Sequence, residues 1–204
     1  MTDLDLDLYF KIYSEEITKF ERKNLGEDFF FYNKRFSDSW LGLDPDVLNT
    51  SYNDFRTILK RLNLPAGKKI VDLGCGYGRL GLLIGKEFPD LKFEGYEYWP
   101  HRLEPALRAS IQHRMKNISF KMRDLLDENY HFPIGDVYFV YLMSSSPSNM
   151  EMLFARLQAI ATPETIIITR KISEPLMIQW APWLGLFDSL NLADARIAFH
   201  RPIP

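Results

Sequence analysis

The sequence has little cysteine, no long apolar run and almost no net charge. Cys75 is the single cysteine among 204 residues, so no disulfide can form within the chain, and a reducing compartment fits it best. No apolar stretch approaches the roughly 20 residues that a membrane-spanning helix needs. The opening MTDLDLDLYF also lacks the basic region of a signal peptide. We therefore expect a cytoplasmic protein with no membrane partner.

Charge and histidine spacing argue against two further classes of site. The net charge of −2 argues against a surface built to hold a polyanion over the whole molecule, so nucleic acid is not an expected partner. The four histidines are scattered without the spacing of metal ligands, and no metal site is predicted. One segment is locally basic and is expected to form a solvated surface; it contains Arg102, Arg108, Arg114, Lys116, Lys121 and Arg123.

The composition is that of a soluble globular protein, with 46% apolar and 25% charged residues. Residues 1–48 are rich in aromatic and acidic side chains, and an amphipathic helix is expected over 9–20. We interpret 1–48 as an appended helical extension that acts either as a lid or only as packing. Residues 49–204 are long enough to form one domain with a sizeable core.

Strands and helices alternate through most of this domain. Apolar patterns predict strands over 68–74, 91–97, 118–124, 136–143 and 164–170. Helices are predicted over 50–64, 79–88, 100–115 and 148–161. Residues 187–201 read as two strands around a turn near Ala193 and Asp194. The predicted fold is therefore α/β: a doubly wound, mostly parallel seven-stranded sheet with an antiparallel C-terminal hairpin.

A glycine-rich loop, IVDLGCGYGRLG at residues 70–81, follows the first predicted strand of this domain. Gly74, Gly76 and Gly78 can adopt positive φ angles and let a ligand approach the main chain, in front of a helix N-terminus. Dinucleotides and S-adenosylmethionine are both bound at loops of this kind. Gly76, Gly78 and Gly81 also form a literal G-x-G-x-x-G, which keeps an NAD(P)-dependent oxidoreductase open as an alternative.

Three acids end predicted strands near this loop. Asp72 stands where a phosphate would be repelled, and it suits a ligand that carries an ammonium and a sulfonium. Glu97 can accept hydrogen bonds from both hydroxyls of a ribose. Asp124 can accept one from an adenine amino group, with Asp127 as a competitor for that role. The three acids indicate a nucleoside ligand with a positive charge.

The motifs VDLGCGYG, GYE and RDLLD, in this order, resemble those of the class I S-adenosylmethionine-dependent methyltransferases over about residues 65–170. The resemblance implies S-adenosylmethionine as cofactor, with Asp72 and the loop glycines at its methionine end and Glu97 at its ribose. It also implies that Asp124 and Leu125 flank the adenine. The neighbouring Cys75, Tyr98 and Tyr141 complete the candidate cofactor-binding set, with Cys75 as a small loop residue rather than a nucleophile.

The segment after the fourth predicted strand, YLMSSSPSNM, should border the transferred methyl group. It lacks the Asn/Asp-Pro-Pro-aromatic motif of enzymes that methylate amino groups of adenine or glutamine. Tyr141 and Ser144 are the candidates to orient an acceptor. The segments VDLGCGYGRL, GYEYWP and RKISEP also resemble lysine methyltransferases of this fold, so a protein lysine stands beside small molecules as candidate acceptor. A non-catalytic binding module with the same fold is the remaining alternative.

Overall fold

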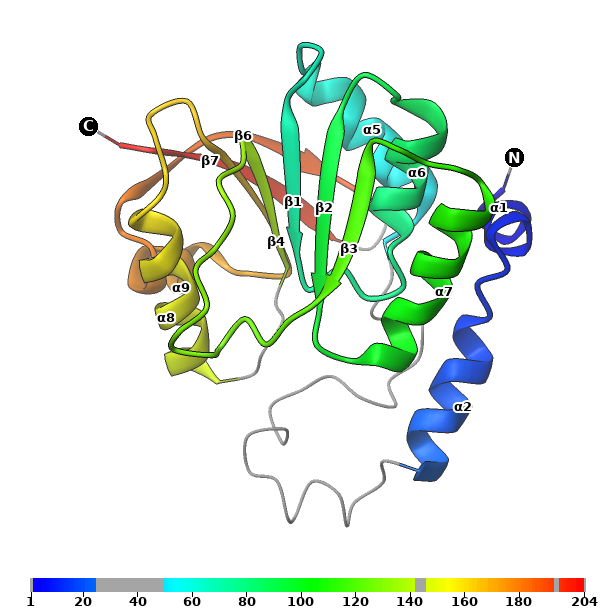
Figure 1. Cartoon of the computed structure of the whole chain (residues 1–204). Coiled ribbons are helices and arrows are strands. Elements are labelled where there is room, and N and C mark those ends of the chain that lie inside the picture. The colour runs from blue at the N-terminus through cyan, green and yellow to red at the C-terminus, as the bar shows by residue number, and fades with distance from the viewer. Residues whose placement is uncertain (1, 25–49, 142–145, 193–194, 204) are drawn as a thin grey trace.

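The structure, a computed structural model, describes residues 2–24, 50–141, 146–192 and 195–203. A seven-stranded sheet runs through the described chain in the order β3-β2-β1-β4-β5-β7-β6 (Figure 1). Strands β1 to β5 are parallel, and β7 lies antiparallel between β5 and β6. The strands are β1 (Lys69–Leu73), β2 (Lys92–Glu97), β3 (Ile118–Met122), β4 (Val137–Tyr141), β5 (Ile166–Arg170), β6 (Leu184–Asn191) and β7 (Arg196–Pro202).

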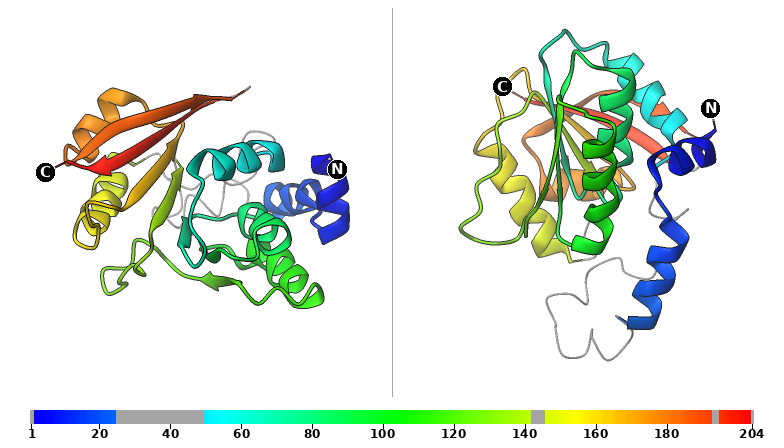
Figure 2. Two further views of the ribbon diagram at one scale, coloured as in Figure 1. Left: turned by 90° about the horizontal axis from the view of Figure 1, so that it is seen from above. Right: turned by 45° about the vertical axis from the view of Figure 1, so that its right-hand side comes forward.

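Helices cover both faces of the sheet. Helices α5, α6 and α7 pack on one face, and α8 and α9 pack on the other (Figure 2). The two N-terminal helices, α1 and α2, lie outside α7 (Figure 1). The helices are α1 (Asp3–Phe10), α2 (Ser14–Asn24), α5 (Tyr52–Leu62), α6 (Arg79–Glu87), α7 (Pro100–Gln112), α8 (Pro147–Gln158) and α9 (Glu174–Trp180). This architecture confirms the predicted fold class, including the C-terminal hairpin and the N-terminal helices.

The central strand β4 shows why the sheet is buried on both sides. Val137 and Phe139 point into the core beneath α5 and α6, while Tyr138 and Val140 point into the core beneath α8. All four are fully buried. Alternate residues of a strand face opposite sides, so a continuous apolar run suits a strand with helices on both faces. The polar strand ends are therefore the places where function can reside.

The N-terminal extension differs from its prediction. The single helix predicted over 9–20 is wrong, because α1 ends at Phe10 and α2 begins at Ser14. Thr2 and Asp5 form a capping box that starts α1 early, and Lys11 ends it in a left-handed conformation with φ of 56°. The predicted boundary between residues 48 and 49 and the turn near 193–194 lie outside the described residues. None of the described helices is long and apolar enough to cross a membrane.

The third predicted strand is shorter than expected. Strand β3 ends at Met122, so Asp124 lies in the loop that follows rather than at the strand end. The backbone amide of Arg123 donates to the carbonyl oxygen of Glu97 at 2.9 Å, which keeps the start of this loop against the end of β2. The two acids remain on neighbouring segments at the same edge of the sheet.

Two glycines of α6 provide a matched test of the packing. A Cβ atom on Gly81 would lie 2.3 Å from a ring carbon of Phe93 and 2.7 Å from Phe120, both buried aromatic side chains. A Cβ atom on Gly85 would meet the flexible end of Met115 at 2.6 Å. We expect Gly81→Ala to lower the free energy of unfolding by about 1–3 kcal/mol through overpacking.

Gly85→Ala should be neutral or stabilising, because Met115 can move and alanine favours the helix. Urea denaturation followed by circular dichroism measures both variants. Equal stabilities for Gly81→Ala and the unchanged protein would contradict the packing that brings α6 onto β2 and β3.

Candidate functional site

The chain turns sharply at residues 74–78, between β1 and α6. The amides of Gly74 and Cys75 both donate to the carbonyl oxygen of Tyr96, at 2.9 and 2.8 Å. The amide of Gly78 donates to the carbonyl oxygen of Cys75 at 2.9 Å. The loop is therefore tied to the end of β2 and closes directly in front of α6. Burial raises the pKa of the Cys75 thiol well above its usual range, which keeps it protonated.

The glycines of this loop have different surroundings. Gly76 has a φ of 53°, and no atom of the described residues lies within 4 Å of the place where a Cβ atom would be. Its backbone therefore faces open space, which a ligand can enter. A Cβ atom on Gly78 would instead lie 2.5 Å from the side chain of Ala106 in α7. Gly78 thus serves close helix packing, and Gly76 leaves the main chain accessible.

Glu97, at the end of β2, is held in place by backbone amides. Its Oε2 accepts a hydrogen bond from the amide of Gly76 at 2.9 Å. Its Oε1 accepts from the amides of Tyr98 and Trp99, at 2.8 and 2.9 Å. A carboxylate offers about four lone-pair positions, so capacity remains for a further donor. The carboxylate is fixed beside the open part of the glycine loop and can accept from ligand hydroxyls.

Asp72 lies at the end of β1, between Gly95 of β2 and Phe139 of β4. It is 9% exposed, and no group of the described residues donates a hydrogen bond to its carboxylate. Burial, and then the negative charge of Glu97, raise the pKa of Asp72 to about 8. A buried acid without a partner is costly to ionise, and a positively charged ligand would remove that cost. The site therefore fits the cationic methionine end of S-adenosylmethionine.

The loop after β3 supplies the third predicted group. Oδ1 of Asp124 accepts a hydrogen bond from the amide of Leu126 at 2.9 Å, which forms a tight turn. Leu125 is buried, and its carbonyl oxygen accepts a hydrogen bond from Arg156 of α8 at 2.6 Å. Tyr98, partly exposed, packs edge-on against Trp99 beside Glu97. The structure places all these residues at the carboxyl edge of the sheet.

Tyr141 ends β4 at the same edge. Its hydroxyl and that of Thr50 are both buried, and the two hydroxyls interact with each other. Burial, followed by the charge of Asp72, raises the pKa of Tyr141, so the phenol stays protonated. Its ring lies 5.7 Å from the guanidinium of Arg170, at the end of β5. Ser144, the other acceptor-orienting candidate, lies outside the described residues.

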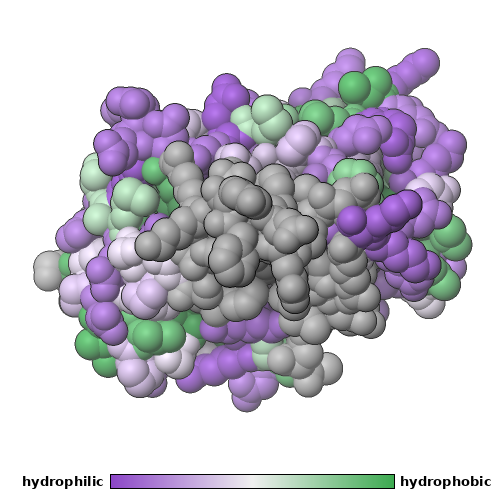
Figure 3. Space-filling model, turned by 90° about the horizontal axis from the view of Figure 1, so that it is seen from below, coloured by the Kyte–Doolittle hydropathy of each residue, from purple (hydrophilic) through white to green (hydrophobic). Residues whose placement is uncertain are grey.

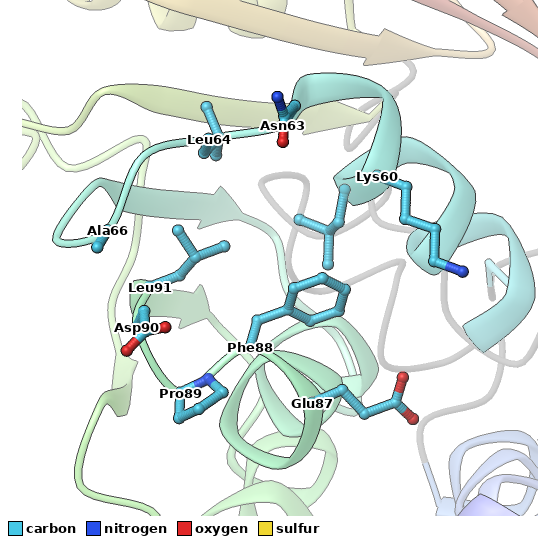
Figure 4. A pocket seen from close by; sticks show the side chains of 10 residues that line it. Lys60, Asn63, Leu64, Ala66, Glu87, Phe88, Pro89, Asp90 and Leu91 are labelled. Carbon is cyan, nitrogen blue, oxygen red and sulfur yellow. The ribbon is translucent and has the colours of Figure 1, made fainter.

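A surface hollow of about 340 Å³ lies at the opposite edge of the sheet. Its lining includes Leu64 and Ala66 before β1 and Pro89 and Asp90 before β2. In Figure 4 the ring of Phe88 lies among the other side chains that line this hollow. The amino ends of β1 and β2 border it, so it is separate from the glycine loop and Glu97.

The N-terminal helices contact the site in a way that sequence reasoning missed. Glu21 of α2, 1% exposed, binds the guanidinium of Arg102 through both oxygens, at 2.6 and 2.8 Å. Arg102 itself is 8% exposed, so the expectation that every basic side chain of 102–123 is solvated is wrong. Asp7 of α1 pairs in the same way with Arg79, the first residue of α6. No local signal joins residues so distant in the chain.

The geometry is typical of nucleotide-cofactor sites at the carboxyl edge of a doubly wound sheet. Residues 64–177 match the family described as "Methyltransferase domain". The chain belongs to this family. This confirms the prediction that it is a class I methyltransferase with S-adenosylmethionine as its cofactor. The oxidoreductase alternative is set aside.

Two kinds of curated relative are similar over parts of the chain. The tRNA (guanine-N(7)-)-methyltransferase of Porphyromonas gingivalis is 28% identical over 78 residues, which are 38% of this chain and 32% of the relative. The trans-aconitate 2-methyltransferase of Variovorax paradoxus is 27% identical over 126 residues, 59% of this chain and 47% of the relative. The chain thus spans about a third to a half of the length of these relatives.

Solved structures share the fold at lower identity. TrmN from Thermus thermophilus has a TM-score of 0.65 at 14% identity, covering 76% of this chain and 49% of that one. An RNA methyltransferase from Salinibacter ruber, solved with S-adenosyl-L-homocysteine, has a TM-score of 0.59 at 19% identity. It covers 76% of this chain and 96% of that one. The tRNA methyltransferases among the curated relatives do not support the expectation that nucleic acid is an unlikely partner.

The raised pKa of Asp72 predicts an effect on stability. The unfolded chain ionises this carboxyl near pH 3.8 and the folded protein only near pH 8, so the folded state loses stability as pH rises across that interval. Asp72→Asn removes this loss. We expect the variant to melt several °C higher than the unchanged protein at pH 8, with a difference that shrinks toward pH 4.

Asp136→Asn serves as the matched control in these melting curves. Burial raises the pKa of Asp136, but hydrogen bonds from Lys68 and from the amide of Lys69 outweigh it and lower the pKa. This variant should melt lower than the unchanged protein at pH 8, and its deficit should fade with acidification. A lower melting temperature for Asp72→Asn at pH 8 would contradict the assigned environment of Asp72.

Proposed function

We propose that this chain binds S-adenosylmethionine along its glycine loop and transfers the methyl group to a polar acceptor. Asp72 would face the ammonium and sulfonium, Glu97 the ribose hydroxyls, and Asp124 with Leu125 the adenine. The observation that carries the proposal is the buried carboxyl of Asp72, which has no hydrogen-bond partner among the described residues, beside the amide-bound carboxylate of Glu97. Of the cofactor classes that use such loops, the one that carries a positive charge at this end suits it best.

The chain's own contribution is binding, orientation and exclusion of water. S-adenosylmethionine, when bound, supplies a methyl group that its sulfonium has already activated. Positioning of two reactants can contribute roughly 7–11 kcal/mol in favourable cases. Tyr141 stays protonated and can donate a hydrogen bond that orients the acceptor. Together with the predicted Ser144, it is the candidate for that role.

Three acceptor classes are the first to test. In Figure 3, which views the molecule from below, the described residues visible around the rim are mostly hydrophilic and their hydrophobic patches are small. The trans-aconitate methyltransferase aligns with more of this chain than the tRNA methyltransferase does, and this favours a small carboxylic acid as acceptor. A tRNA is the second candidate, because several tRNA methyltransferases align with part of this chain, and a protein lysine is the third.

Thermal melting with S-adenosylhomocysteine tests the proposed cofactor. At a ligand concentration a hundredfold above Kd, we expect the melting temperature to rise by about 5–10 °C. NAD at the same concentration should leave it unchanged, because its pyrophosphate would meet the Asp72 and Glu97 carboxylates. Transfer of radiolabelled methyl to small carboxylic acids, total tRNA and a lysine-rich protein then identifies the acceptor class.

Asp72→Asn is the control for this shift, since it removes the charge and keeps the shape. The variant should remain folded and lose most of the response to S-adenosylhomocysteine. A rise in melting temperature with NAD alone would overturn the proposal. Binding without methyl transfer to any of the three acceptor classes would favour a non-catalytic binding module.

A further inference from the structure

The two N-terminal helices hold the two loops that form the proposed cofactor site. Asp7 of α1 contacts Arg79, directly after the glycine loop, and also accepts a hydrogen bond from the hydroxyl of Tyr52 at 3.1 Å. Glu21 of α2 contacts Arg102, in the first turn of α7 directly after the Glu97 loop. In Figure 1, α2 runs beside the end of α7 nearest to the carboxyl edge of the sheet. The extension is therefore part of the architecture of the site.

The Glu21–Arg102 pair is buried and bidentate. Nε of Arg102 donates to Oε1 of Glu21 at 2.6 Å, and Nη2 donates to Oε2 at 2.8 Å. Nε2 of His101 lies 2.8 Å from the same Oε1. The guanidinium also lies 6.0 Å from the ring centre of Tyr77, inside the glycine loop. A buried cation of this kind requires a carboxylate, and Glu21 supplies it through two parallel hydrogen bonds.

A second carboxylate acts on the same guanidinium. Arg102 comes five residues after Glu97 in the sequence. The negative charge of Glu97 acts on its guanidinium together with that of Glu21. Glu97 already accepts three backbone hydrogen bonds and keeps only part of its capacity for a ligand. A guanidinium that turned toward Glu97 would occupy that capacity. In the structure its nitrogens donate to Glu21 instead, at 2.6 and 2.8 Å.

We propose that Glu21 is a positioning residue for the cofactor site: it holds Arg102 away from Glu97 and so leaves Glu97 available to the ribose hydroxyls. This inference rests on the proposed function. It assigns to α2 a role in ligand affinity although Glu21 itself would not touch the ligand. If the pair only fastened α2 to α7, its loss would change stability and leave the chemistry of Glu97 unchanged.

A double-variant experiment separates these two roles. Isothermal titration calorimetry with S-adenosylhomocysteine measures Glu21→Gln, Arg102→Met and the variant that carries both. We expect Glu21→Gln to weaken binding about tenfold or more, because the released guanidinium competes for Glu97. The double variant removes that cation and should bind within about threefold of the unchanged protein. Replacing both members of a buried ion pair by neutral groups often leaves a protein stable.

Glu16→Gln is the matched control, because it makes the same chemical change at an exposed position of α2. It should bind as the unchanged protein does. If Glu21→Gln does not fold, Glu21→Asp replaces it; this variant keeps the charge but cannot reach both nitrogens, and it should weaken binding severalfold.

Two results would overturn the inference. One is unchanged affinity in a folded Glu21→Gln or Glu21→Asp variant. The other is a double variant that binds as weakly as Glu21→Gln alone, because restored binding is the result that a purely structural role does not produce. Failure of the unchanged protein to bind S-adenosylhomocysteine would instead reject the proposed function.

Discussion

The chemistry of the site depends on the burial of two acids side by side, at the ends of neighbouring parallel strands. Glu97 receives three backbone hydrogen bonds, whereas Asp72 receives none from the described residues and has a pKa raised to about 8. Two such acids are costly to ionise together, because like charges in a poorly solvated place repel each other. A positively charged ligand stabilises the ionised acids, and this stabilisation contributes to its binding affinity. The proposed cofactor carries such a charge.

The elements around this pair fix its geometry. The glycine loop is bound to the end of β2 through the carbonyl oxygen of Tyr96, and Gly76 joins the loop to Glu97 through its amide. Helices α1 and α2 add two ion pairs from outside, to Arg79 and to Arg102. Both loops are thus held from the sheet side and from the N-terminal side. The extension therefore belongs to the site by its contacts.

The sequence was sufficient for the parts of the site that local patterns encode. The apolar run of β4 indicated a strand buried on both faces, and the acids Asp72 and Glu97 at strand ends had to meet at one edge of a parallel sheet. It was insufficient where distant residues meet. The burial of Arg102 depends on Glu21 in another helix, and the packing role of Gly81 depends on Phe93 and Phe120. Neither is visible in a pattern of neighbouring residues.

Proton release on cofactor binding tests the central claim most directly. At pH 7 the free protein holds Asp72 mostly protonated, and the positive charge of S-adenosylmethionine should lower its pKa. Titration calorimetry at pH 7 in buffers of different ionisation enthalpy then measures the number of protons released. The account predicts release of close to one proton for each bound S-adenosylmethionine. Binding heats that do not depend on the buffer would contradict it.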